Sequence, residues 1–115
     1  MPLFKLETSA ELTEKKQADL LKALSKIISE EIGKPETYVM GSVTQSAMMM
    51  SGSREPAAFA DVRSIGGLTR DVNRMIADRI CSLLQKELSL EPDRVYLNFT
   101  EFTRENWGWN SGTFG

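Results

Sequence analysis

The sequence predicts an α+β fold in which a strand–helix–strand unit occurs twice, giving a four-stranded sheet with two helices on one face. Two amphipathic segments of helical period lie in the two halves of the chain, each flanked by short segments typical of strands. A proline follows each helical segment, at Pro35 and at Pro92, about half the chain apart. These observations predict a single domain over residues 1–115, with related halves at about 2–45 and 57–102.

The first half begins with residues 2–8, where apolar and charged residues alternate as in a strand with one buried face. A helix of about five turns follows, because apolar residues recur at helical spacing over Leu20–Ile32. The Gly33-Lys34-Pro35 turn predicts its end, since glycine adopts the left-handed cap conformation and proline cannot continue a helix. The run Tyr38–Val43 predicts the second strand, and the Ser/Gly/Pro-rich stretch Gln45–Pro56 a connection.

The second half repeats this order. The apolar run Phe59–Ile65 predicts the third strand, which ends at Gly66-Gly67. Thr69 is a suitable N-cap for a second amphipathic helix over Val72–Leu88. The alternating segment Val95–Thr100 predicts the fourth strand, ahead of a Gly/Asn-rich aromatic tail.

A helix that crosses between two strands implies that these strands are parallel within each half, with a right-handed crossover. Helices on one face of the sheet leave a second face, which is either polar and wet or covered by a partner. Ala58, Ala60 and Val62 share one side of the third strand. Their small apolar side chains favour burial of that second face by other subunits.

The composition of the chain restricts the chemistry that it can carry out. The net charge of -2 gives no electrostatic reason to bind nucleic acid or an anionic membrane, so neither partner is expected. The absence of histidine and the single cysteine, Cys81, remove the commonest metal ligand, the commonest general base and any internal disulfide. With no signal peptide and no spanning segment apparent, we expect a cytoplasmic protein, or one secreted by a route without a signal peptide.

The chain terminus offers a base that no count of side chains includes. Aminopeptidases generally remove an initiator methionine before a small residue, which would leave Pro2 as a terminal secondary amine. An α-amino group has a pKa of about 7.7 to 8.0, and burial or a nearby cation lowers it. Such an amine accepts protons near neutral pH, as a general base must. Met-Pro starts are common, so this feature alone does not identify an enzyme.

Short motifs in a fixed order extend over essentially the whole chain. They are Met1-Pro2-Leu3-Phe4, Gly33-Lys34-Pro35, Ser53-Arg54-Glu55-Pro56, Ser64-Ile65-Gly66-Gly67, Asp93-Arg94-Val95-Tyr96-Leu97-Asn98, and the tail with Trp107-Gly108-Trp109-Asn110 and Thr113-Phe114. Each motif is weak, but their order and spacing together are specific. In these motifs the chain resembles the macrophage migration inhibitory factor family of the tautomerase superfamily.

The resemblance implies a homotrimer in which the three sheets line a central barrel and the helices lie outside. It also implies that each active site lies between neighbouring subunits, with Pro2 at its floor as the catalytic base. Lys34 and Ile65 would line the pocket from the same subunit, and Tyr96 and Asn98 from the next. The implied reaction is keto–enol tautomerisation of phenylpyruvate-like or dopachrome-like aromatic compounds, with no metal and no organic cofactor.

The residue types suit these roles, although each also has a simpler interpretation. Lys34 would bind the carboxylate of a small aromatic keto acid, but a lysine at a helix C-terminus also favours the helix dipole. Ile65 would offer a backbone N–H to the substrate, or simply pack at a strand end. Tyr96 and Asn98 lie on the same face of the fourth strand, since they are two residues apart.

The aromatic tail is the remaining candidate for substrate contact. Trp109 and Phe114 suit an aromatic-lined pocket, although tail aromatics more often only dock a terminus. Trp107 lies near the expected pocket mouth, and we predict that it affects substrate size more than rate.

Two other functions stay open at this point. The first is a cytokine or cytokine mimic, for which binding to a cell-surface receptor of a host or of the same organism matters more than turnover. The second is dehalogenation or decarboxylation of small acids, which in the superfamily uses extra arginines close to the proline. Only Arg63 and Arg94 are near enough in sequence terms to support it. Thiol–disulfide exchange is not expected, because Ala57-Ala58-Phe59-Ala60 stands where animal members carry Cys-x-x-Cys.

Overall fold

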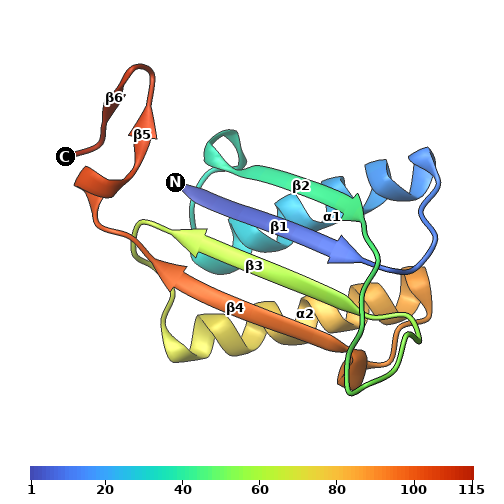
Figure 1. The fold of residues 1–115 in the computed structure, drawn as a ribbon. Helices are drawn as coiled ribbons and strands as arrows, with labels where there is room; N and C mark the ends of the chain where they lie inside the picture. Colours follow the sequence, from blue (N-terminus) through green and yellow to red (C-terminus); the bar gives the residue numbers. More distant parts are fainter.

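The computed structural model describes residues 1–115 and has a mixed four-stranded sheet in the order β2-β1-β3-β4, with both helices on one face (Figure 1). The elements are β1 (Pro2–Thr8), α1 (Glu14–Ile32), β2 (Met40–Gln45), β3 (Ala58–Ser64), α2 (Arg70–Leu88) and β4 (Val95–Glu101). β1 is parallel to β2, β3 is parallel to β4, and the two central strands are antiparallel. The predicted α+β class and the parallel pairing within each half are confirmed.

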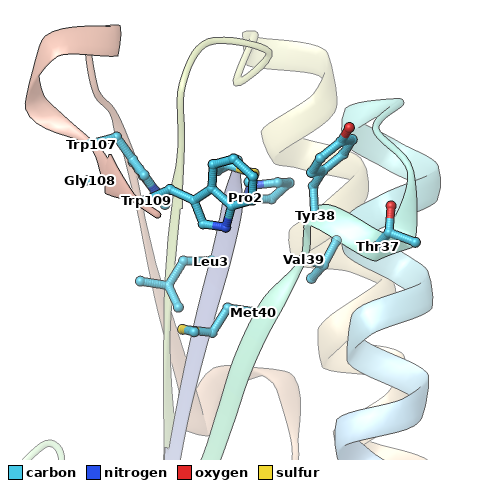
Figure 2. A pocket seen from close by; sticks show the side chains of 10 residues that line it. Pro2, Leu3, Thr37, Tyr38, Val39, Met40, Trp107, Gly108 and Trp109 are labelled. Atoms are coloured by element: carbon cyan, nitrogen blue, oxygen red, sulfur yellow. The ribbon is translucent and has the colours of Figure 1, made fainter. Parts of the chain in front are cut away.

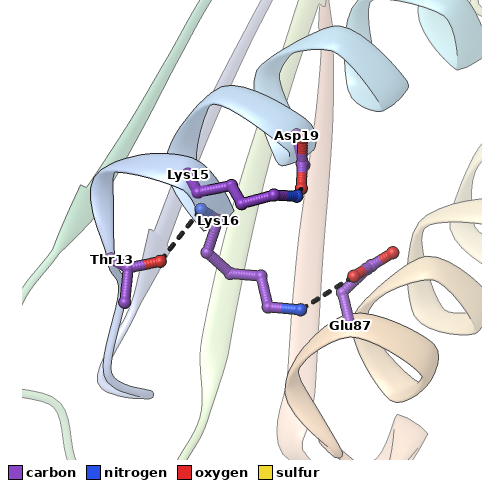
Figure 3. Close-up of polar contacts among 5 residues, drawn as sticks. All are labelled: Thr13, Lys15, Lys16, Asp19 and Glu87. Atoms are coloured by element: carbon purple, nitrogen blue, oxygen red, sulfur yellow. Dashed lines mark hydrogen bonds and ion pairs between the residues drawn. The ribbon is translucent and has the colours of Figure 1, made fainter.

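Side-chain caps set the starts of both helices. The Thr13 hydroxyl accepts a hydrogen bond from the Lys16 amide at 3.1 Å at the start of α1, and Thr69 accepts from Val72 at 3.2 Å at the start of α2. α1 ends at Gly33, whose φ of 78° is the left-handed cap that the sequence predicts. Lys16 also joins the two helices, because its Nζ lies 2.9 Å from a carboxylate oxygen of Glu87 (Figure 3).

The core lies between the two helices and one face of the sheet. Its largest fully buried apolar side chains are Leu6, Leu20, Leu24, Ile28, Val62, Ile76, Ile80 and Leu84. Ala58, Ala60 and Val62 belong to this core, so the prediction that they favour burial by other subunits is wrong. Alternation along a strand shows which residues share a face, but not which face meets the helices.

The opposite face of the sheet is mixed, with charged residues on its central strands and the apolar or aromatic residues Leu3, Met40, Phe59 and Tyr96 among them. Its central strands carry Lys5 and Glu7 on β1 and Asp61 and Arg63 on β3, and the last two form an ion pair at 2.8 Å. Ser42 and Thr44 of β2 and Asn98 and Thr100 of β4 lie on the same face, on either side of these charges.

Two predicted strand boundaries differ in the structure. The second strand begins at Met40 rather than Tyr38, because Glu36–Tyr38 forms a 3-10 turn whose Tyr38 amide donates to the Pro35 carbonyl at 3.0 Å. Ile65 lies outside β3, since the chain turns at Gly66 and Gly67 with φ of 72° and 81°.

The tail contains a hairpin that is not among the elements predicted from the sequence. Its strands are β5 (Gly108–Trp109) and β6 (Gly112–Thr113). Asn110 and Ser111 form the turn at positive φ, 52° and 65°, as tight hairpins require. Neither helix is long and apolar enough to cross a membrane.

Candidate active site

The start of β1 forms the floor of a cavity of about 320 Å³, and Pro2 is buried there. Three parts of the chain surround it: the N-terminus, the segment between α1 and β2, and the C-terminal hairpin. Figure 2 shows Trp109 and Tyr38 on either side of Pro2 in that view. The lining is mostly apolar and consists of Met1, Pro2, Leu3, Thr37, Tyr38, Val39, Met40, Trp107, Gly108 and Trp109.

A second cavity of about 340 Å³ adjoins the first, and Met1 and Tyr38 border both. Its other walls are Lys34, Pro35 and Phe114. The Lys34 ammonium donates to the Ile65 carbonyl at 3.4 Å, which ties the turn after α1 to the turn after β3. Thus the end of α1, the end of β3 and the tail meet around the N-terminus.

The electrostatics at the N-terminus favour a neutral amine. The pKa of the Met1 amine is lowered from its usual value, first by burial and then by the positive charge of Lys34. Both causes disfavour a further positive charge at this end of the sheet.

Two ring–ring contacts fix the positions of the aromatic side chains in the tail. The Trp109 and Phe114 rings stack with centroids 5.8 Å apart and an interplanar angle of 10°. Trp107 meets Phe102 edge to face at 5.6 Å, and the Arg63 guanidinium lies 6.0 Å from the Phe102 ring centre. Trp109 therefore lines the first cavity and Phe114 the second, as one stacked pair.

Two predicted site residues lie elsewhere in the folded chain. Tyr96 and Asn98 are exposed on the face of β4 that points away from the helices, and neither lines a cavity beside Pro2. In the sheet register Pro2 lies opposite Ser64, and Ser64 opposite Glu101. Asn98 is thus three residues, about 10 Å, further along the strand. One chain alone brings Pro2, Lys34, Ile65, Trp109 and Phe114 to the same end of the sheet, and leaves Tyr96 and Asn98 away from it.

Tyr38 and Met40 also line the first cavity, although neither is predicted from the sequence as a site residue. The sequence predicts that Tyr38 belongs to the second strand, where strand alternation would determine the face to which its side chain points. The 3-10 turn Glu36–Tyr38 instead places it between the two cavities. An aromatic residue three positions after Pro35, before the next strand begins, is the signal that could have indicated this position.

The two arginines that would support other superfamily chemistry are engaged elsewhere. The Arg94 guanidinium donates to the backbone carbonyls of four residues, Met50, Ser53, Glu55 and Pro56. Arg63 is paired with Asp61. Neither arginine lines a cavity beside Pro2.

Comparisons with known proteins cover the chain from end to end. A model of the family described as macrophage migration inhibitory factor matches residues 1–115. The curated macrophage migration inhibitory factor of Meriones unguiculatus is 33% identical over 115 residues, 99% of each chain, and the homolog of Brugia malayi is 34% identical over 116 residues, 100% of each. The structure of the macrophage migration inhibitory factor-like protein from Entamoeba histolytica aligns with a TM-score of 0.94 at 37% identity, covering 98% of each chain. The homologue from Prochlorococcus marinus aligns at 0.92 and 33% identity, covering 98% of this chain and 99% of that one. The chain therefore belongs to the macrophage migration inhibitory factor family and has the fold of the tautomerase superfamily.

Proposed function

We propose that this protein is a keto–enol tautomerase of phenylpyruvate-like or dopachrome-like aromatic compounds, and that its general base is the Pro2 amine after removal of Met1. The observation that carries the proposal is the burial of Pro2 on the floor of a mostly apolar cavity beside Lys34. Family membership supports the same class of reaction.

The surroundings of the N-terminus support a neutral amine at physiological pH. Burial and the Lys34 charge lower the pKa of the Met1 amine, and the Pro2 nitrogen is one residue further into the same site. A neutral secondary amine has a free lone pair for proton abstraction. The amine takes the proton from the carbon next to the keto group, the C–H electron pair forms the enol double bond, and the resulting ammonium protonates the enolate oxygen. The reverse sequence regenerates the ketone.

The residues that line the two adjoining cavities suit both ends of an aromatic keto acid. Lys34 supplies a positive charge for the carboxylate. The stacked Trp109 and Phe114 rings supply aromatic surface for the substrate ring. In this arrangement the acidic carbon of the substrate lies over Pro2.

We further propose that the working unit is a homotrimer in which Tyr96 and Asn98 complete the site of the neighbouring subunit. Tyr96 is 67% exposed on a β4 face that no element of its own chain covers. An exposed tyrosine next to an exposed amide is a suitable pair of hydrogen-bonding groups for a partner's substrate.

The test combines the mass of the intact protein with phenylpyruvate turnover. We expect the mass to correspond to a chain without Met1. The variant Pro2→Gly still permits removal of Met1 and should lose about 100-fold in kcat/KM, since it lacks the ring that holds the amine. Pro92→Gly, at the start of a 3-10 turn remote from the cavities, is the matched control and should retain activity. Full turnover by Pro2→Gly, or by a chain that keeps Met1, would contradict the proposal.

An interaction role is the second candidate. The relatives are named for an effect on macrophages rather than for a reaction. Such a role predicts receptor binding by Pro2→Gly at the same affinity as wild type, whereas a purely enzymatic role predicts no receptor binding by either protein.

A further inference from the structure

Ser64 is the one fully buried serine of the sheet whose hydroxyl has no hydrogen-bond partner. Its side chain is 0% exposed, and its Oγ makes no hydrogen bond within the protein. Thr8, equally buried at the other end of the central strand pair, donates to the Ala57 carbonyl at 2.8 Å and accepts from the Ala10 amide at 3.1 Å. A buried hydroxyl is normally satisfied in this way, so the isolation of Ser64 needs an explanation.

The position of Ser64 supplies one. In the antiparallel pair of β1 and β3, Ser64 is the direct partner of Pro2. Both residues lie on the buried side of their strands, toward the helices. Directly opposed residues have Cβ atoms about 5 Å apart, so the Ser64 hydroxyl and the Pro2 ring are neighbours.

Met1 determines whether Pro2 can bond to that hydroxyl. While Met1 is attached, the Pro2 nitrogen is part of a tertiary amide and has neither an N–H nor an available lone pair. After Met1 is removed, the same nitrogen becomes a secondary amine with one N–H when neutral and two when protonated. The partner that Ser64 lacks therefore arises only in the processed chain.

We propose that Ser64 is a positioning residue whose Oγ accepts a hydrogen bond from the Pro2 amine. The inference rests on the proposed function, in which Pro2 is the base. The ring carbons occupy two of the four directions around the nitrogen. With the N–H directed to Ser64 on the helix side, the lone pair takes the remaining direction, into the cavity. After proton abstraction, one N–H of the Pro2 ammonium keeps its hydrogen bond to the Ser64 Oγ. The other N–H carries the abstracted proton, which can return to the substrate.

The hydrogen bond has a measurable consequence for the amine. An ammonium N–H is a stronger donor than an amine N–H, so the Ser64 hydroxyl favours the protonated form. Loss of the hydroxyl should lower the pKa of Pro2. The other titratable side chains that line the cavities beside Pro2 are Lys34 and Tyr38, and both are unchanged in the variants below.

The first experiment needs no substrate. Chains labelled with ¹⁵N-proline are titrated by NMR, where Pro2 is the only one of the 4 prolines that can be a free amine. We expect Ser64→Ala to lower the pKa of Pro2 relative to wild type. Ser64→Thr keeps a hydroxyl and should restore the wild-type titration, while Thr8→Val removes a buried hydroxyl at the far end of the strand pair and should not alter it. An unchanged pKa in Ser64→Ala would overturn the proposal.

Kinetics and stability provide independent readouts. With phenylpyruvate, Ser64→Ala should lower kcat about tenfold and leave KM unchanged, because Ser64 orients the base and does not touch the substrate. The melting temperature of Ser64→Ala should fall in the processed chain but not in a chain cleaved from a tag so as to retain Met1, where the hydroxyl has no partner to lose. Equal effects in both chains would assign Ser64 a purely structural role and overturn the proposal. If wild type itself has no turnover, the proposed function fails, while the titration still decides the role of Ser64.

Discussion

Lys34 carries the positive charge that acts on the N-terminal amine, and its replacement tests two roles at once. Lys34→Gln should raise the pKa of Pro2, because the cation no longer disfavours a second positive charge. The rise of kcat/KM with pH should therefore occur at higher pH than in wild type. KM for phenylpyruvate should increase about tenfold, as the carboxylate loses a charged partner.

A pH–rate profile of phenylpyruvate turnover measures both effects of this change. Lys22→Gln, on the exposed side of α1, removes the same charge away from the cavities and should leave the profile and KM unaltered. A profile of Lys34→Gln that coincides with that of wild type would contradict the electrostatic role of Lys34.

Trp107 should determine which aromatic substrates fit. Its indole lines the cavity and is braced by Phe102 at 5.6 Å. Trp107→Val should increase kcat/KM for ring-substituted phenylpyruvates about tenfold relative to phenylpyruvate, because it removes bulk from one wall. The measurement is a series of para-substituted substrates, with Trp109→Val as a comparison that should weaken binding of every member. An unchanged order of preference in Trp107→Val would exclude this role.

At the scale of elements, the packing of β2 beside β1 depends on a glycine opposite Phe4. Gly41 is the parallel partner of Phe4, and a Cβ at Gly41 would overlap the Phe4 ring. Phe4 is only 2% exposed and has little room to move. Gly41→Ala should therefore lower the free energy of unfolding by about 1–3 kcal/mol.

Urea denaturation measures this loss. Gly112→Ala is the matched control, because no atom lies within 4 Å of a Cβ placed there. Equal free energies of unfolding for Gly41→Ala and Gly112→Ala would show that the packing of Phe4 does not require a glycine at position 41.

At the scale of the whole molecule, the proposed trimer predicts complementation between inactive chains. Pro2→Gly lacks the base, and Asn98→Ala lacks the group offered to the neighbouring site. When the two variants are unfolded together and refolded, about a quarter of the sites should combine an intact Pro2 with a partner's intact Asn98. Phenylpyruvate turnover should then exceed that of either variant alone. A mixture no more active than the average of the two would contradict a site shared between subunits.

Much of the fold can be predicted because its signals are local. The predicted caps Thr69 and Gly33 each act within one turn of helix, and the structure contains both. Pro2 and Lys34 are identified as candidates because they occur in short motifs at fixed spacing. The start of the second strand is misplaced because the preference of Tyr38 for a strand competes with a 3-10 turn after Pro35, and the turn prevails.

Periodicity and short motifs along the chain are therefore sufficient for the α+β class, the order of the elements and the candidate base. Three features required the folded chain: the side of β3 that faces the helices, the closure of the C-terminal hairpin over Pro2, and the isolated hydroxyl of Ser64 beside it. Each of these depends on contacts between segments far apart in the sequence. Such contacts are set by packing, and local patterns carry no information about them.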